Sequence, residues 1–128
     1  MVARMIRSII AVIAGLVFIL FTHVVTDDAM HASGVFPPED QPMVDPGLYA
    51  LALGYRSFFS ILGCALTAAL APSRPMTHAL VLGVVGTVLA SLGAYMAMKL
   101  NLGPMWYAIA LPASALPCAW LGGMLVRR

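Results

Sequence analysis

The chain has 128 residues, which is enough for one domain, and 62% of them are hydrophobic while only 9% are charged. Its mean hydropathy is +0.96, whereas an average soluble domain is about half apolar and about one quarter charged. These values exclude a water-soluble globule. Seven basic against five acidic side chains also lack the dense basic surface that nucleic-acid binding needs. We therefore expect a small integral membrane protein.

The first predicted membrane span covers residues 6–28 and includes a run from 8 to 26 without a charged side chain. A helix needs about 20 mostly apolar residues to cross the roughly 30 Å hydrocarbon layer. The apolar region of a secretory signal peptide is shorter, at about 7 to 15 residues. We therefore expect this segment to remain in the protein as an anchor.

A polar loop at residues 29–46 follows the first span, and residues 27–46 together hold all five acidic side chains and four of the nine prolines. Three further spans are predicted at residues 47–71, 76–98 and 105–126. Only short turns separate these three spans, and only helices or closed barrels satisfy their backbone within lipid. The sequence therefore predicts one all-α domain, an antiparallel bundle of four transmembrane helices.

Positively charged side chains gather on one side of this predicted bundle. Lys99 alone lies on the other side, against five arginines near span ends: Arg4, Arg7, Arg74, Arg127 and Arg128. Because short loops rich in Lys and Arg stay in the cytoplasm, we expect both termini there and the 29–46 loop outside.

Two rows of small or polar residues at steps of four predict how the last two spans pack. In lipid, helices associate by close backbone approach over small side chains, because no hydrophobic effect drives them together. We expect both rows to face the bundle interior. The rows are Gly83, Thr87, Ser91 and Tyr95 in one span, and Ala110, Ser114, Cys118 and Gly122 in the other.

Arg56 is the single charge inside the second span. A guanidinium near the bilayer centre costs about 3 kcal/mol even on insertion scales, so it normally faces the bundle interior, a water-filled cavity or an opposite charge. Its helix supports this direction, because Tyr49, Arg56, Ser60, Gly63 and Thr67 share one helical face that is polar or small.

The depth of Arg56 suggests its partners. At 1.5 Å per residue, Arg56 lies about 13 Å below the start of its helix and His23 about 22 Å above the inner boundary, so their levels nearly coincide. Asp27 lies one turn above His23. We predict that Arg56 pairs with Asp27 or Asp28 across the first two spans. The predicted outward-facing polar pocket consists of Arg56, His23, Asp27, Asp28, Tyr55 and Ser60.

Three interpretations of this pocket remain open. The ion pair fixes only the register of two helices and adds little net stability after desolvation. Alternatively, the pocket binds or conducts a solute, or Arg56 extends alone to the lipid head groups.

A metal site is a weaker interpretation of the same region. His23 and His31 are eight residues apart, with Asp27 between them, and imidazole suits copper or zinc. Two such histidines are about 12 Å apart along the helix, however, so they do not easily share one ion. Cys64 and Cys118 have no metal or redox spacing, and we interpret them as packing residues. We expect no cofactor.

Five segments of the later part of the chain form a series: Tyr55-Arg56-Ser57, Leu70-Ala71-Pro72-Ser73-Arg74-Pro75-Met76, His78-Ala79-Leu80-Val81-Leu82-Gly83, Leu102-Gly103-Pro104-Met105-Trp106-Tyr107, and Leu116-Pro117-Cys118-Ala119-Trp120-Leu121-Gly122-Gly123. In this series the chain resembles a family of small bacterial four-helix membrane proteins that has no assigned activity. The resemblance covers about 75 residues and implies four spans in a bacterial inner membrane. It supplies no catalytic residues.

We expect a non-enzymatic protein, because no activated nucleophile or carboxylate pair with an adjacent base occurs on a helix face. The first hypothesis is an accessory or scaffolding protein that associates through its helix faces with membrane lipid, another copy of itself or a larger complex. The alternative is a small transporter or binding protein for a proton, a metal ion or a small solute. That function would use the outward-facing polar pocket.

Overall fold

The structure is a computed structural model that describes residues 2–38, 45–101 and 104–126. These residues form four helices: α1 (Val2–Ala32), α2 (Pro46–Leu70), α3 (Pro75–Lys99) and α4 (Met105–Leu125). Each helix is long and apolar enough to cross a membrane. The predicted all-helical architecture and the four candidate spans are therefore confirmed.

The ends of α2 and the start of α3 follow from local chemistry. Asp45 caps α2, because its side chain accepts a hydrogen bond of 2.8 Å from the Gly47 backbone N–H, and Pro46 occupies the first helical position. The α2 helix ends at Leu70, two residues before Pro72. Arg74 then adopts a left-handed backbone with φ of 48°, which reverses the chain before Pro75 starts α3.

The α1 helix is longer than the predicted first span. Residues 29–32, which were expected in the outer loop, are helical up to Ala32, because no proline or glycine lies between residues 29 and 33 and alanine and methionine favour helix. Gly34, with φ of +84°, then turns the chain back. The Phe36 N–H donates to the Met30 carbonyl at 3.0 Å, and the Phe36 side chain is buried.

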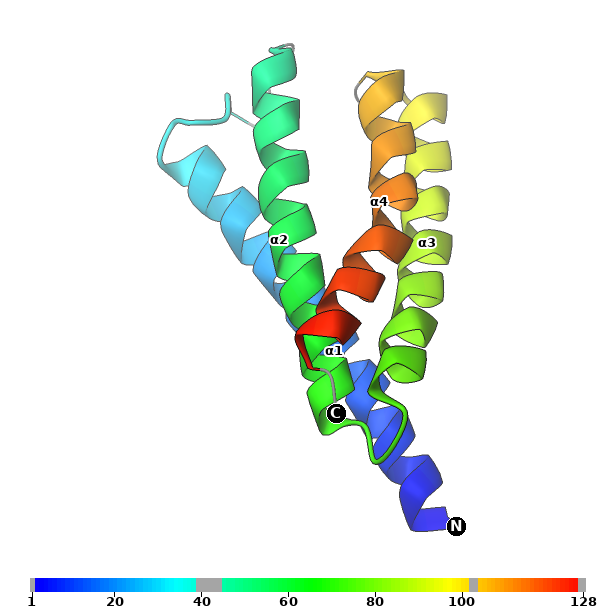
Figure 1. Cartoon of the computed structure of the whole chain (residues 1–128). Helices are drawn as coiled ribbons and strands as arrows, with labels where there is room; N and C mark the ends of the chain where they lie inside the picture. Colours follow the sequence, from blue (N-terminus) through cyan, green and yellow to red (C-terminus); the bar gives the residue numbers. More distant parts are fainter. Residues whose placement is uncertain (1, 39–44, 102–103, 127–128) are drawn as a thin grey trace.

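The helices are arranged as two pairs, α1 with α2 and α3 with α4 (Figure 1). The α2 helix also packs on α4, whereas α1 and α3 touch over a much shorter region. The two pairs diverge toward the end of the bundle at which α2 and α4 begin (Figure 1). We call this the loop end, and we call the opposite end, where α2 ends and α3 begins, the turn end.

Small residues allow the helices to meet closely toward the turn end. A Cβ atom added to Gly122 of α4 would lie 2.7 Å from the Cβ of Cys64 in α2, so only glycine permits this approach. Thr67 is fully buried, and its hydroxyl donates across to the Ala11 carbonyl of α1 at 2.7 Å. The buried core consists of Cys64, Ala68, Ala79, Leu82 and Ala119.

Candidate functional site

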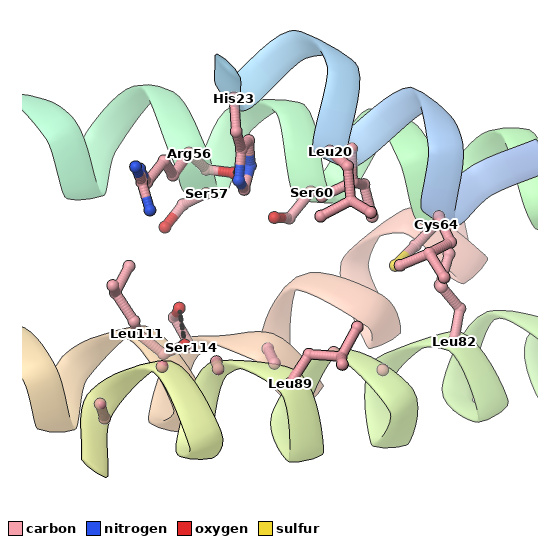
Figure 2. A pocket seen from close by; sticks show the side chains of 18 residues that line it. Leu20, His23, Arg56, Ser57, Ser60, Cys64, Leu82, Leu89, Leu111 and Ser114 are labelled. Carbon is pink, nitrogen blue, oxygen red and sulfur yellow. Dashed lines mark hydrogen bonds between the residues drawn. The ribbon is translucent and has the colours of Figure 1, made fainter. Parts of the chain in front are cut away.

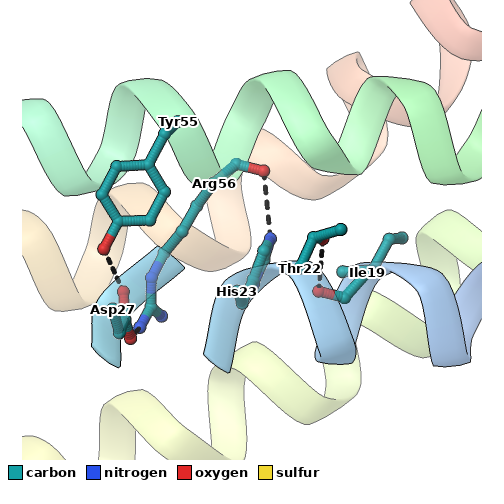
Figure 3. Close-up of polar contacts among 6 residues, drawn as sticks. All are labelled: Ile19, Thr22, His23, Asp27, Tyr55 and Arg56. Atoms are coloured by element: carbon teal, nitrogen blue, oxygen red, sulfur yellow. Dashed lines mark hydrogen bonds and ion pairs between the residues drawn. The ribbon is translucent and has the colours of Figure 1, made fainter. Parts of the chain in front are cut away.

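Arg56 and Asp27 form an ion pair between α2 and α1, through Nη2 and Oδ2 respectively. The Tyr55 hydroxyl donates to the other oxygen of the same carboxylate (Figure 3). Both side chains of the ion pair are 27% exposed, so the pair is shielded but not dry. Asp27 is thus the carboxylate that pairs with Arg56, and the neighbouring Asp28 is exposed.

His23 joins the same two helices one turn away from Asp27. Its Nε2 atom lies 3.1 Å from the Arg56 carbonyl oxygen (Figure 3). A carbonyl oxygen only accepts hydrogen bonds, so the Nε2–H of His23 is the donor. Consecutive turns of α1 therefore contact both the backbone and the side chain of Arg56, at the common level that the depth argument predicted.

A cavity of about 350 Å³ lies next to this polar cluster, between the two helix pairs (Figure 2). All four helices contribute to its wall, which is mostly apolar. The lining residues are Leu16, Ile19, Leu20 and His23 from α1; Arg56, Ser57, Ser60 and Cys64 from α2; Leu82, Gly83, Gly86, Leu89, Ala90, Gly93 and Ala94 from α3; and Leu111, Ser114 and Ala115 from α4.

Missing side chains on α3 create part of this space. A Cβ atom added to Gly93 would meet no atom within 4 Å, and one added to Gly86 would meet only the Ala115 Cβ, at 3.8 Å. Both glycines line the cavity. A larger residue at position 93 would therefore occupy the cavity before it disturbed a neighbouring helix.

Polar atoms lie mainly on the α2 wall. The hydroxyls of Ser57 and Ser60 point from α2 toward the α3–α4 pair (Figure 2). A side-chain hydrogen bond also joins Ser57 to Cys118 of α4. Across the cavity, the Ser114 hydroxyl donates to the Leu111 carbonyl of its own helix at 2.8 Å. The cavity thus has donors on one wall and hydrocarbon on most of the others.

The Nε atom of Arg56 is buried and has no hydrogen-bond partner among the described residues. A buried donor without an acceptor costs about 1–3 kcal/mol. Asp27 occupies the Nη2 side of the same guanidinium. The site therefore balances the positive charge of Arg56 but leaves one of its donors to be satisfied.

Two aromatic rings meet between α2 and α4 toward the loop end. Tyr49 of α2 and Tyr107 of α4 have ring centroids 5.0 Å apart, and Tyr49 is buried. The two long side chains span the space between the diverging helices. Entry between α2 and α4 from the loop end would therefore require these rings to separate.

The α1–α3 side is joined at the turn end and exposed farther along. His78 of α3 lies within 2.8 Å of the Ser8 hydroxyl of α1, through Nε2 and Oγ. Toward the loop end, Leu20 of α1 and Leu89 of α3 both line the cavity, yet they are 50% and 45% exposed. We call the edge formed by Leu20 and Leu89 the mouth of the cavity.

The residues of the predicted pocket divide into three groups. His23, Arg56 and Ser60 line the cavity. Asp27 pairs with Arg56, and Tyr55 donates to Asp27, so both residues adjoin the cavity through Arg56. Asp28 is exposed on α1.

The α3 wall of the cavity was missed by sequence reasoning, although a signal for it exists. Gly83, Gly86, Ala90 and Gly93 follow one another at spacings of three, four and three, which keeps them on one helical face. All four line the cavity. This run of small residues could have identified the hollow face of α3.

The two histidines of the metal interpretation have separate partners. His31 Nδ1 lies 2.9 Å from the Pro37 carbonyl, and its ring packs edge-on against Phe36 with centroids 5.4 Å apart. His23 contacts Arg56 instead. Within residues 2–38, 45–101 and 104–126, no group of three His, Cys, Asp or Glu side chains is arranged to hold a metal ion.

Comparison with known proteins identifies no relative of the chain: no protein-family model matches it, no curated protein matches it and no solved structure matches it.

Proposed function

We propose that the chain is an antiparallel four-span protein of a bacterial inner membrane, with both termini in the cytoplasm and the loop end outside. Four helices of sufficient length and apolarity support insertion. The excess of arginine near the turn end and the two termini supports the orientation. The resemblance to small bacterial four-helix membrane proteins is consistent with this location.

Reporter fusions test the orientation. A reporter enzyme that is active only outside the cytoplasm should be active when inserted after Ser33 and inactive when fused to the C-terminus. A fluorescent reporter that matures only in the cytoplasm should give the opposite pattern. Activity of the first reporter at the C-terminus would overturn the proposed orientation.

We propose further that the protein is not an enzyme but binds a small amphipathic molecule in the cavity. The observation that carries this proposal is the cavity itself, with about 350 Å³ of space and with Arg56, Ser57 and Ser60 at its wall. Small-molecule sites typically measure about 300–1,000 Å³ and combine apolar walls with a few placed polar groups. A purely structural ion pair would need no adjoining hollow.

A scaffolding function is the second candidate, and α1 favours it. Only Ala11 and Gly15 of this helix are buried, so most of its surface is available to lipid, to a second copy of the chain or to a larger membrane complex. In this function the cavity would be incidental to helix packing.

A pair of glycine substitutions separates the two candidates. Gly93→Leu fills the cavity, whereas Gly54→Leu is a matched control, because a Cβ at Gly54 meets no atom within 4 Å and Gly54 does not line the cavity. Both changes raise helix propensity by a similar amount, roughly 1 kcal/mol.

Binding of an apolar fluorescent probe to the purified protein in mild detergent is the measurement. The binding function predicts that Gly93→Leu abolishes probe binding and that Gly54→Leu leaves it unchanged. Equal binding by both variants would contradict a ligand site in the cavity. Co-purification of a membrane partner with both variants would then support the scaffolding function.

A further inference from the structure

The cavity is polar near one end and apolar at the other. Arg56 and Ser57 lie toward the loop end, whereas Cys64 and Leu82 lie toward the turn end (Figure 2). Arg56 and Cys64 are eight residues apart on one helix, which corresponds to about 12 Å. A long apolar space with donors near one end matches an alkyl chain that carries a polar group.

The mouth of the cavity is apolar. Leu20 and Leu89 form its edge and are 50% and 45% exposed, and in the proposed orientation this edge faces the hydrocarbon of the membrane. On the α2–α4 side, Tyr49 and Tyr107 approach each other closely. A ligand that passes between Leu20 and Leu89 would therefore enter sideways from the lipid.

The charges at the polar end favour an uncharged acceptor. Asp27 already balances the guanidinium of Arg56, so an additional carboxylate would place a second negative charge beside Asp27 where screening is weak. The hydroxyls of Ser57 and Ser60, next to Arg56 on α2, point toward the cavity and can donate hydrogen bonds to a ligand. An ester carbonyl accepts hydrogen bonds without adding charge.

We propose that the cavity holds one acyl chain of a membrane glycerolipid, which enters between α1 and α3. The ester carbonyl lies at the Ser60 hydroxyl, near Arg56, and the chain extends toward Cys64 and Leu82. This proposal rests on the proposed binding function and names its ligand class. A phospholipid and a diacylglycerol share the acyl ester, so either can supply the ligand.

Photocrosslinking tests this proposal with the full chain in vesicles of phosphatidylethanolamine and phosphatidylglycerol. The probe is a phospholipid with a diazirine at the end of one acyl chain, and crosslinked residues are mapped by mass spectrometry. We expect crosslinks at Cys64 and Leu82, the closed end of the cavity. Gly93→Leu should reduce them about tenfold, equivalent to about 1.4 kcal/mol in occupancy, and Gly54→Leu should leave them unchanged.

Competition identifies the source and the polar group. Unlabelled diacylglycerol should reduce the crosslinks if the acyl ester suffices, whereas reduction by phospholipid alone would show that the head group is also recognised; both outcomes support an acyl-ester ligand. Stronger competition by an ionised fatty acid than by either ester would overturn it. Ser60→Ala should weaken crosslinking several-fold, and Ser91→Ala, at an exposed position on α3, should not.

The outcomes separate this proposal from the binding function on which it rests. Crosslinks confined to lipid-exposed helix faces, with no effect of Gly93→Leu, would overturn the acyl-chain proposal. If the apolar fluorescent probe still lost its binding in Gly93→Leu, the cavity would remain a ligand site for another class of molecule. Insensitivity of both probes to Gly93→Leu would remove the ligand site as well.

Discussion

Asp27 is the residue on which the α1–α2 polar contacts converge. Its two carboxylate oxygens accept from Tyr55 and Arg56, and His23 of the same helix donates to the Arg56 backbone. These partners were accessible to sequence reasoning, because the fixed rise of a helix sets the level of each side chain in two adjacent spans. The unpaired Arg56 Nε was not, because its environment depends on the final rotamer and on the neighbouring cavity.

Substitutions at this ion pair should be strongly non-additive. Asp27→Asn leaves the guanidinium without its countercharge and should lower the free energy of unfolding by about 2 kcal/mol, less than for a fully buried pair because both side chains are 27% exposed. Adding Arg56→Leu removes the orphaned charge and should recover most of that loss. Denaturant unfolding in mixed micelles measures the free energy of unfolding of the two single variants and of the double variant. A loss in the double variant equal to the sum of the two single losses would contradict the predicted coupling.

At the level of single helices, the two rows of small residues illustrate what spacing alone predicts. The row of Gly83, Thr87, Ser91 and Tyr95 was expected to face the interior, but Gly83 is buried while Ser91 and Tyr95 are exposed. Each step of four residues rotates about 40° beyond a full helical turn, so the row leaves the interior face after two steps. Spacings that alternate between three and four residues stay on one face, as they do along the cavity wall of α3.

A threonine hydroxyl that donates to a neighbouring helix should contribute more to stability than one that donates within its own helix. The Thr67 hydroxyl bonds to α1, whereas the Thr87 hydroxyl bonds to the Gly83 carbonyl of its own helix at 2.8 Å. Thr67→Val should therefore lower the free energy of unfolding by roughly 0.6–1 kcal/mol, the usual value for a hydrogen bond between membrane helices. Thr87→Val, its matched control, should change it by less, and an equal loss in both variants would contradict an α1–α2 contribution of Thr67.

For the whole molecule, access to the cavity depends on the difference between the α2–α4 side, where two tyrosine rings meet, and the α1–α3 side, where leucines are exposed. The extents of α2, α3 and α4 could be predicted from composition and proline positions, whereas α1 is longer than its predicted span. The divergence of the two pairs could not, because it depends on how closely α2 and α4 approach at Gly122 and on the rings of Tyr49 and Tyr107 farther along. Those contacts join residues about 60 positions apart in the sequence, and helical periodicity alone does not define the relative rotation of such distant helices.

A cysteine at position 60 can report access, because Ser60 lines the cavity and is only partly buried, whereas Cys64 is 2% exposed. In a Ser60→Cys variant that also carries Cys64→Ala and Cys118→Ala, a lipid-soluble maleimide should label position 60 faster than a water-soluble one, since the mouth faces the hydrocarbon. Tyr107→Ala should raise labelling by the water-soluble reagent several-fold, because removing that ring opens the α2–α4 side to the aqueous phase. Tyr95→Ala is the control, since Tyr95 lies on α3, outside the contact between Tyr49 and Tyr107, and is 60% exposed. The water-soluble reagent could instead label the cysteine equally fast in the protein that keeps both tyrosines and in the Tyr107→Ala variant. In that case the rings do not close that side, and lateral entry from lipid loses its main structural argument.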